Sequence, residues 1–385
     1  MHVMFIPSWY SNERNKVHGS FFKEQALALQ NRGVKITVAY NEIWPLTLMT
    51  KVKEKSGLYF AVEDTLRTYR YKNYNFIPKN PLMFKSFNKR MEKLFKEIEK
   101  KEGKIDIIHA QSSLWGGISA SYLSKKFNIP LVITEHSSVE RGPYVRASYI
   151  PFIIDSYKTA KELIVVGNGL KKEVEKLSHR NDIKVIGNLI DFSDFPLKEK
   201  MNKEKFTFFS LAFLEGEKGF DTLIKSFAKA FKGREDCELV IGGDGSQRQW
   251  LESLAKEEGI EESVIFLGGL SRDEVSKWMR KCDVFVLPSK YETFGVVYIE
   301  ALASGTPVIG TFNGGAEDII NKDNGYIVNV DDISALSNVM KEAIDNKEKF
   351  NPKKLREYCF ENFSPDIISD KIISVYKNII NESEL

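Results

Sequence analysis

The sequence predicts an α/β protein built from two doubly wound domains, each with a parallel sheet. Short apolar segments of strand length alternate with amphipathic helical segments, and this alternation occurs twice along 385 residues. The length also exceeds what one hydrophobic core usually supports, so two domains of similar size are expected. We place them at residues 1–194 and 195–364, and we expect the last helix, 365–385, to pack back on the first domain.

The first half begins with a strand at 2–6, a polar loop and a helix at 21–30, which the stretch Asn31-Arg32-Gly33 ends before a second strand at 34–40. The same alternation of strands and helices then continues. We expect further strands at 105–109, 131–134, 163–166 and 183–186, and helices near 116–126, 150–161 and 170–177.

Residues 194–205 are polar and charged, and we interpret them as an interdomain linker. After them the alternation restarts, so ligands are expected at the carboxyl ends of the strands and between the domains. We expect strands at 206–211, 237–242, 264–267, 284–287 and 308–310, and helices at 219–231, 247–257, 272–280 and 296–303.

Composition narrows the class of protein. With 42% hydrophobic and 28% charged residues, a disordered or fibrous chain is excluded. No apolar run approaches the ~18 residues of a membrane-spanning helix. Cys237, Cys282 and Cys359 lie far apart, which predicts reduced structural thiols and neither a disulfide framework nor a zinc site. We therefore expect a cytoplasmic protein.

Charge is unevenly distributed along the chain. Residues 1–190 carry 31 Lys and Arg against 18 Asp and Glu, and the remainder carries 25 against 35. A basic surface of this kind meets anionic lipid or a phosphorylated acceptor, or is simply a solvated helix face. We expect no nucleic-acid partner. Within 81–104 we interpret the pattern as a membrane-facing helix, with Lys85, Lys89, Arg90, Lys93 and Lys96 interleaved with Met83, Phe84, Phe87, Met91, Leu94 and Phe95.

The most informative stretch is 288–309. A buried strand leads into a loop that carries Glu292, and a helix that starts near Gly295 carries Glu300 just over a turn inside. A helix N-terminus presents unpaired N–H groups and a positive dipole end, so it can hold a diphosphate without a metal ion. The two carboxylates would then flank one anion and accept hydrogen bonds from hydroxyl groups.

Two glutamates separated by seven residues, between Val-Phe-Val-Leu-Pro-Ser and Ala-Leu-Ala-Ser-Gly-Thr-Pro-Val-Ile, resemble the motif of the retaining glycosyltransferases of group 1, also called family four. That resemblance implies the GT-B fold, in which two Rossmann-like domains face a central cleft. It implies that Glu292 contacts hydroxyls of the donor sugar and that Glu300 holds the ribose of the nucleotide. It further implies that backbone amides of Phe294, Gly295 and Val296 meet sugar and phosphate.

The segment Glu217-Lys218-Gly219 resembles the Lys-Gly pair of the same family, whose lysine grips the diphosphate and stabilises the leaving group. An arginine usually stands five residues before this lysine, but here the residue is Phe213. Losing one charge-assisted phosphate contact costs about 1.5–3 kcal/mol unless another donor replaces it.

Glycine-rich turns resemble further parts of the donor site. Gly243 and Gly245 lie in a turn that approaches the nucleotide in the family, although a purely structural turn is the alternative. The segment that contains Gly268 and Leu270 resembles one whose backbone contacts the base. The stretch 314–317 resembles a Gly-Gly-x-x-Glu segment, where close backbone geometry near the donor is expected.

In the first domain, the resemblance places Gly19 where the backbone approaches phosphates or the transferred sugar, and a loop-to-helix junction is the alternative. It places His136 near the donor sugar, although a lone histidine is more often structural. His109 is expected to be structural or to act behind the site, since Gln111 stands where relatives often carry a second histidine.

The resemblance as a whole implies transfer of a hexose from a UDP- or GDP-sugar to an acceptor hydroxyl, with retention. The acceptor is expected to be a saccharide or lipid-linked, in cell-surface polysaccharide or glycolipid synthesis, at the inner face of the plasma membrane. Asp-x-Asp spacing is missing from the expected places, which predicts no metal, and no cofactor is expected. A nucleotide-sugar epimerase, a catalytically weak donor-binding partner subunit and, less favoured, a dehydrogenase stay open as alternatives.

Overall fold

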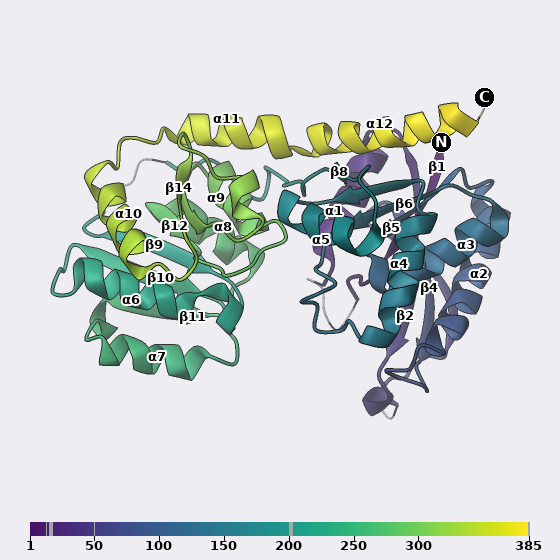
Figure 1. The fold of residues 1–385 in the computed structure, drawn as a ribbon, viewed down its shortest axis with the longest axis horizontal. Coiled ribbons are helices and arrows are strands. Elements are labelled where there is room, and N and C mark those ends of the chain that lie inside the picture. The colour runs from purple at the N-terminus through teal and green to yellow at the C-terminus, as the bar shows by residue number, and fades with distance from the viewer. Residues whose placement is uncertain (13, 15–17, 50, 200–202, 384–385) are drawn as a thin grey trace. The chain divides into compact units, whose positions relative to one another are not determined.

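The structure, a computed structural model, describes residues 1–12, 14, 18–49, 51–199 and 203–383. The chain divides into two compact units (Figure 1): Met1–Leu189 together with Pro365–Leu385, and Ile190–Ser364. Each unit is a parallel sheet covered by helices, apart from one antiparallel edge strand in the first, so the predicted class of two doubly wound domains is confirmed. The division after Leu189 lies five residues before the expected one.

The first unit contains an eight-stranded sheet with the order β3-β4-β2-β1-β5-β6-β7-β8. All pairs are parallel except β3 with β4. The strands are β1 (His2–Pro7), β2 (Lys35–Trp44), β3 (Gly57–Glu63), β4 (Leu66–Tyr74), β5 (Ile107–Gln111), β6 (Leu131–Glu135), β7 (Glu162–Val165) and β8 (Lys184–Val185).

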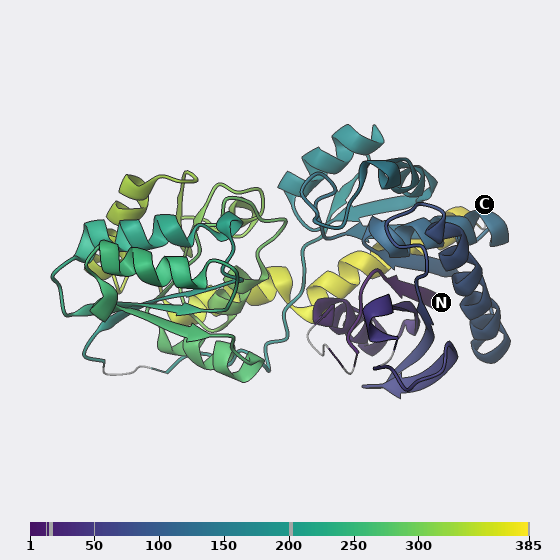
Figure 2. The ribbon, with the colours of Figure 1, turned by 90° about the horizontal axis from the view of Figure 1, so that it is seen from below.

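Helices cover both faces of this sheet. In two views at right angles, α12 lies beside α1 on one face, while α2, α3 and α4 pack in a row on the other (Figures 1 and 2). Because both faces are covered, every residue of β1 is buried. The helices are α1 (Ser20–Asn31), α2 (Met83–Glu102), α3 (Ile118–Phe127), α4 (Ile150–Thr159), α5 (Asn168–Ser178) and α12 (Pro365–Ser383).

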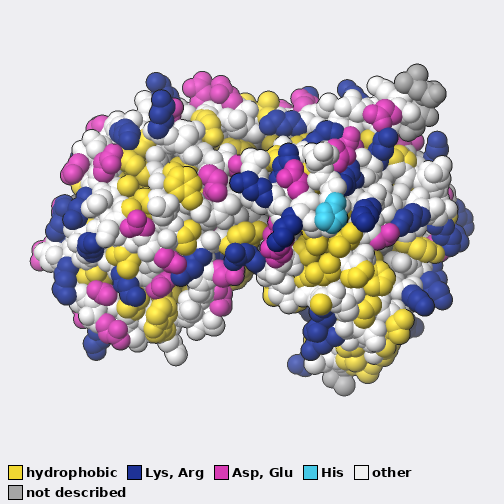
Figure 3. Space-filling model, viewed as in Figure 1, with side chains coloured by type: hydrophobic (Ala, Val, Ile, Leu, Met, Phe, Trp, Pro, Cys, Tyr) yellow, Lys and Arg dark blue, Asp and Glu magenta, His cyan; other side chains and the backbone are white. Residues whose placement is uncertain are grey.

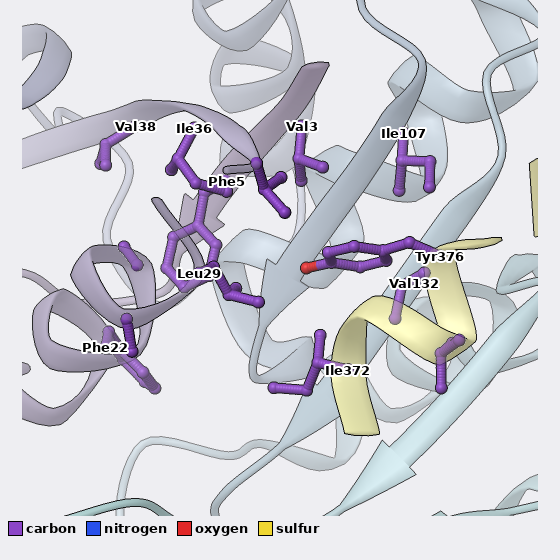
Figure 4. Close-up of a cluster of buried hydrophobic side chains, with 14 of the residues drawn as sticks. Val3, Phe5, Phe22, Leu29, Ile36, Val38, Ile107, Val132, Ile372 and Tyr376 are labelled. Carbon is purple, nitrogen blue, oxygen red and sulfur yellow. The ribbon is translucent and has the colours of Figure 1, made fainter. Parts of the chain in front are cut away.

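The final helix supplies part of the core of the first unit. Ile372 and Tyr376 of α12 point into the same cluster as Phe5 and Leu29 (Figure 4). The Tyr376 hydroxyl lies 2.5 Å from His109 Nδ1, and both side chains are fully buried. Thus His109 joins the central strand β5 to the last helix.

The second unit contains a six-stranded parallel sheet with the order β11-β10-β9-β12-β13-β14. Its strands are β9 (Phe206–Leu211), β10 (Cys237–Gly242), β11 (Val264–Gly268), β12 (Val284–Val286), β13 (Val308–Thr311) and β14 (Gly325–Val328). Its helices are α6 (Phe220–Phe231), α7 (Arg248–Glu257), α8 (Arg272–Lys281), α9 (Val296–Ala303), α10 (Ile333–Asp345) and α11 (Pro352–Phe363).

The linker interpretation of residues 194–205 is wrong over 194–199. Phe195 is fully buried, Ser276 Oγ donates to the Asp194 carbonyl at 2.6 Å, and the Lys198 amide donates to Ser304 at 2.9 Å. This segment therefore packs into the second unit. Residues 200–202 lie outside the described part of the chain.

The interpretation of 81–104 as a membrane-facing helix is also wrong for its apolar residues. All six apolar residues named for it are buried against the sheet and α3, at 4% exposure or less. The alternation therefore reports a core face, and only the basic face meets solvent. In the part of the chain that the structure describes, no helix combines the length and apolar character that crossing a bilayer requires.

Candidate functional site

The strand order of the second unit creates one position where the chain changes direction. From β9 the chain moves outward through β10 and β11, then returns to pair β12 with the other side of β9. The loops that follow β9 and β12 therefore leave the same sheet edge in opposite directions. In open α/β sheets this is where ligands bind.

Those two loops bring together Lys218 and Glu292, which were predicted from the sequence as separate site residues. Lys218, in the loop after β9, donates from Nζ to Glu292 Oε1, in the loop after β12, at 2.6 Å. The side chains are 26% and 14% exposed. Ser289 Oγ donates to the same carboxylate oxygen at 2.9 Å, and the Glu292 amide donates to the Asn313 carbonyl at 3.1 Å. Both the backbone and the side-chain carboxylate of Glu292 are therefore held in place.

The two loops interlock through Gly219, which directly follows the lysine. Its φ is +70°, and a Cβ at this position would lie 2.1 Å from the Pro288 carbonyl oxygen. The Lys290 amide also donates to the Glu217 carbonyl at 2.8 Å. A side chain at 219 would push the loops apart, so the geometry of the pair depends on glycine.

Helix α9 begins directly after Glu292 and its loop. Gly295 is the N-cap, Val296 is the first helical residue, and no described side chain caps this end. Its first amides are thus available to an anion. Phe294 is buried with its ring 5.7 Å from Phe363, so only its backbone can serve a ligand, while Glu300 is buried within the helix.

The glycine turns lie at the neighbouring strand ends and are tied to each other. The Gly243 amide donates to the Gly268 carbonyl at 2.7 Å, and Leu270 Cδ1 would lie 2.8 Å from a Cβ at Gly242. A Cβ at Gly245 would approach the Leu214 carbonyl oxygen at 2.6 Å. These residues form one continuous backbone surface beside the Lys218 loop.

The 314–317 turn supports the loop from the other side. A Cβ at Gly315 would lie 2.7 Å from both the nitrogen and the oxygen of Phe294. The Glu317 carboxylate accepts from the amides of Asn313 and Gly314, at 3.1 and 3.0 Å. The backbone of this turn thus lies close to the backbone of Phe294.

Phe213, in the place of the usual arginine, is 77% exposed. A cation that the sequence did not suggest lies on the adjacent turn: Arg248 Nη1 would be 3.0 Å from a Cβ at Gly268. Arg248 is the first residue of α7 and pairs with Glu252 at 3.0 Å. In the sequence, only its position after the turn that contains Gly243 and Gly245 could have indicated that Arg248 lies near the site.

In the first unit, His136 follows β6 and packs against the rings of Phe21 and Phe22, with centroids at 5.3 and 4.9 Å. Its Nε2 lies 2.8 Å from Gln111 Oε1. Burial lowers the pKa of His136 to about 3, opposed by a smaller effect of the Asn188 side chain. Its imidazole is therefore neutral at ordinary pH and suits hydrogen bonding rather than proton donation.

Gln111 continues this chain of contacts inward, since its Nε2 lies 3.1 Å from His109 Nε2. Burial, and secondarily His136, lower the pKa of His109 to about 3. His109 is thus a structural residue behind His136. Gly19, the N-cap of α1, lies against the loop after β1, where a Cβ would be 2.6 Å from the Trp9 carbonyl oxygen.

Comparisons with known proteins agree with this geometry. Residues 191–363 match the family model of group 1 glycosyl transferases, and residues 19–194 match that of glycosyltransferase family 4. An uncharacterized glycosyltransferase of Methanocaldococcus jannaschii is 32% identical over 317 residues, 73% of this chain and 78% of the relative. The alpha-monoglucosyldiacylglycerol synthase of Streptococcus pneumoniae is 26% identical over 361 residues, 85% of this chain and 82% of the relative.

Solved structures show the same fold. Sucrose-phosphate synthase from Thermosynechococcus elongatus superposes with a TM-score of 0.77 at 18% identity, over 99% of this chain and 100% of that chain. Anabaena HepE in complex with UDP superposes with a TM-score of 0.75 at 17% identity, over 98% and 100%. This chain therefore belongs to the group 1, family 4 glycosyltransferases, and its fold is GT-B.

Proposed function

We propose that this protein transfers a hexose from a UDP-sugar to an acceptor hydroxyl, with retention of anomeric configuration and without a metal ion. The observation that carries the proposal is the meeting of Lys218 and Glu292 at the switch point of the second sheet, beside the uncapped start of α9. The choice of UDP is supported by the Anabaena relative in fold, which is described in complex with UDP-glucose.

In this proposal the second unit holds the donor. Lys218 and the first amides of α9 contact the diphosphate, Glu292 accepts hydrogen bonds from sugar hydroxyls, and Glu300 holds the ribose. The turns that contain Gly243, Gly245, Gly268 and Leu270 provide a surface for the nucleotide. The amides of Phe294, Gly295 and Val296 contact the phosphates. The positive charge of Lys218 then neutralises the diphosphate, as a metal ion would do in a metal-dependent enzyme.

Chemistry follows from that arrangement. The bond between the anomeric carbon and the diphosphate oxygen breaks, and the acceptor oxygen attacks the anomeric carbon on the same face. The departing phosphate oxygen accepts the acceptor proton, so no protein nucleophile is needed. Lys218 stabilises the negative charge that develops on the leaving group. His136, kept neutral by burial, and Gly19 belong to the first unit and are proposed to contact the donor sugar and its phosphates.

The acceptor is proposed to be a saccharide or a lipid, in cell-surface polysaccharide or glycolipid synthesis. The pneumococcal relative, named for a product that carries diacylglycerol, supports the lipid class. A protein that glycosylates such an acceptor works at a membrane surface, and we propose the cytoplasmic face.

The test uses the purified full chain. A thermal-shift series with UDP, GDP and their hexose derivatives identifies the donor, because a ligand of the native state raises the unfolding midpoint by mass action. We expect stabilisation by UDP compounds in the presence of EDTA. Proton NMR of the product then reads the anomeric configuration. Inversion, or binding that requires a divalent ion, would contradict the proposed mechanism.

A second function is favoured by one observation, the exposed Phe213 in the place of a phosphate-binding arginine. A weak hold on the diphosphate fits a donor-binding partner subunit with little turnover. The two functions separate in the same experiment. UDP-sugar binding without transfer to any extracted acceptor supports the partner subunit, and conversion of the donor sugar without an acceptor would instead indicate an epimerase.

A further inference from the structure

A cavity of about 550 Å³ lies in the first unit, at the carboxyl ends of β1 and β5. These strands are neighbours, and the chain leaves them in opposite directions, through β2 and through β6. The cavity thus occupies the switch point of this sheet, and its volume is in the range of small-molecule sites.

The walls of the cavity are mostly apolar. Trp9 follows β1, Trp115 follows β5, and Phe87 and Met91 come from α2. No lysine or arginine is among the described residues that line it. A phosphate or carboxylate would find no Lys or Arg among these described residues, so an anionic ligand is disfavoured and a hydrocarbon group is favoured.

Two polar side chains in this cavity lack partners. Neither the amide nitrogen nor the amide oxygen of Asn41 makes a hydrogen bond to any described residue, and the same holds for Ser119 Oγ, whose residue is 2% exposed. Leaving buried polar groups unpaired costs about 1–3 kcal/mol each. They would be satisfied by a ligand that carries hydroxyl or ester oxygens beside its hydrocarbon part.

The wall that carries Trp115 is held in a strained backbone. Trp115 has φ 69° and ψ −71°, and Ser112 has φ 62° and ψ 147°. Such conformations cost about 1–3 kcal/mol each and gather at ligand clamps. Ser8 Oγ holds this turn by donating to the Ser112 carbonyl at 2.9 Å and accepting from the Gly116 amide at 3.0 Å.

Glu135, the one carboxylate among the described residues of the lining, also supports this wall. Its Oε2 accepts from the Ser113 amide and the Tyr157 hydroxyl, each at 2.8 Å, and its Oε1 accepts from the His136 amide at 3.0 Å. These hydrogen bonds hold the Glu135 carboxylate in place and compensate its charge. The carboxylate therefore does not prevent an uncharged ligand from binding in the cavity.

An exposed apolar surface adjoins the cavity. Tyr144 lines it and is 74% exposed, and Phe152, 40% exposed, lies 5.1 Å from the ring of Phe84, which in turn lies 5.9 Å from Trp115. Leu82, two residues before Phe84, is 55% exposed. Hydrophobic side chains gather on this unit over α4 and the loop before it (Figure 3). Contiguous exposed apolar groups mark interaction sites, including sites that face lipid.

We propose that the cavity holds the hydrocarbon part of an uncharged amphiphilic acceptor, a glycerolipid with a free hydroxyl, which enters past Tyr144 from a lipid surface. This inference rests on the proposed glycosyltransferase function and names its acceptor class. Asn41 and Ser119 pair with the oxygens of the glycerol portion, and the rings of Trp9 and Trp115 pack against its chain.

Intrinsic tryptophan fluorescence tests this without a donor. Two of the five tryptophans line the cavity, so a monoacylglycerol with a brominated chain, used below its micelle concentration, should quench the full chain saturably. Trp115→Phe and Trp9→Phe should each lower the quenched amplitude. Trp250→Phe, at an exposed position in the second unit, is the matched control and should leave it unchanged.

Equal quenching in all variants, or none in the wild type, would overturn the proposal. So would displacement of the lipid by a soluble disaccharide, which would make the cavity a saccharide site. Since Trp115 sits in strained backbone, Ser119→Leu serves as an independent variant and should weaken lipid binding about tenfold. UDP stabilisation measured on the same samples separates the two claims. UDP binding without lipid quenching contradicts only the acceptor class, whereas quenching without UDP binding contradicts only the donor function.

Discussion

Lys218 and Glu292 form an ion pair 2.6 Å long across the two loops that follow β9 and β12. The lysine that is proposed to bind a diphosphate is thus paired with the carboxylate that is proposed to bind the sugar. A donor would exchange one partner of Lys218 for a doubly charged one and release Glu292 for hydroxyl groups.

Lys218→Met should lower kcat/KM for transfer by about 10²–10³, the usual loss when one preorganised group that stabilises leaving-group charge is removed. Lys229→Met is the matched control, since Lys229 lies on α6 and bonds only to Ser334 Oγ among the contacts described. Steady-state kinetics with the UDP-sugar identified by thermal shift would measure both. Equal loss in the two variants would remove Lys218 from the mechanism.

Glu292→Gln and Glu300→Gln should differ in which ligand they affect. Glu292→Gln should weaken UDP-sugar binding but not UDP binding, because its proposed contact is with the sugar, while Glu300→Gln should weaken both. Calorimetric titration of each variant with the two ligands would show this. Because the Lys218–Glu292 pair is partly exposed, its loss should change the free energy of unfolding by less than about 1 kcal/mol.

Gly219→Ala should both destabilise the second unit and lower activity, since its Cβ would overlap the Pro288 carbonyl and its φ is positive. We expect a loss of about 1–3 kcal/mol. Gly233→Ala provides the control: its φ is +82°, but its Cβ would meet no atom within 4 Å. It should show only the cost of the backbone conformation and full activity in urea-denaturation and transfer assays. Matching losses would mean that the contact with Pro288 is unimportant.

The two buried histidines should make the first unit sensitive to acid. Their pKa values are lowered from 6.5 to about 3, so between these limits the unfolded chain binds protons that the folded chain does not. Stability is therefore full above about pH 6.5 and falls as pH decreases toward 3, by up to about 1.4 kcal/mol per pH unit for each histidine.

His109→Gln should make that acid dependence shallower, although it loses the contact with Tyr376 and lowers stability at neutral pH. Urea denaturation between pH 4 and 7 would give both quantities. An unchanged slope would show that His109 already binds its proton in the folded state.

Asn41→Leu should raise the free energy of unfolding by about 1 kcal/mol, because it removes buried amide atoms without partners in a nearly isosteric exchange. The same variant should weaken the lipid acceptor about tenfold. Denaturant unfolding and acceptor titration would measure the two effects. A loss of stability instead would indicate that the amide is already satisfied in solution.

The sequence was informative where strands are continuous and apolar. Alternation alone predicted β1, β9 and β10. It did not predict the reversal of strand order that brings Lys218 and Glu292 together. Edge strand β3 was missed because its apolar residues Leu58, Phe60 and Val62 face solvent, so their alternation does not report burial.

Other features depend on packing between distant segments. The apolar residues of α2 have the same pattern whether they face a sheet or a membrane, and only the structure shows that they are core. Unpartnered groups such as Asn41 and Ser119 cannot be recognised locally, since a missing hydrogen bond depends on every neighbour. The roles of His136 and Glu300 stay predictions, since burial alone does not define a ligand.

The hydrogen bond between Tyr376 and His109 has a consequence for how the protein is made. A ribosome finishes β5 long before it reaches α12, so the part of the sheet face beside α1 stays uncovered while the second unit is translated. Folding of the first unit is then completed only when α12 has been translated, and a chain cut before Pro365 would expose apolar core residues that chaperones would bind.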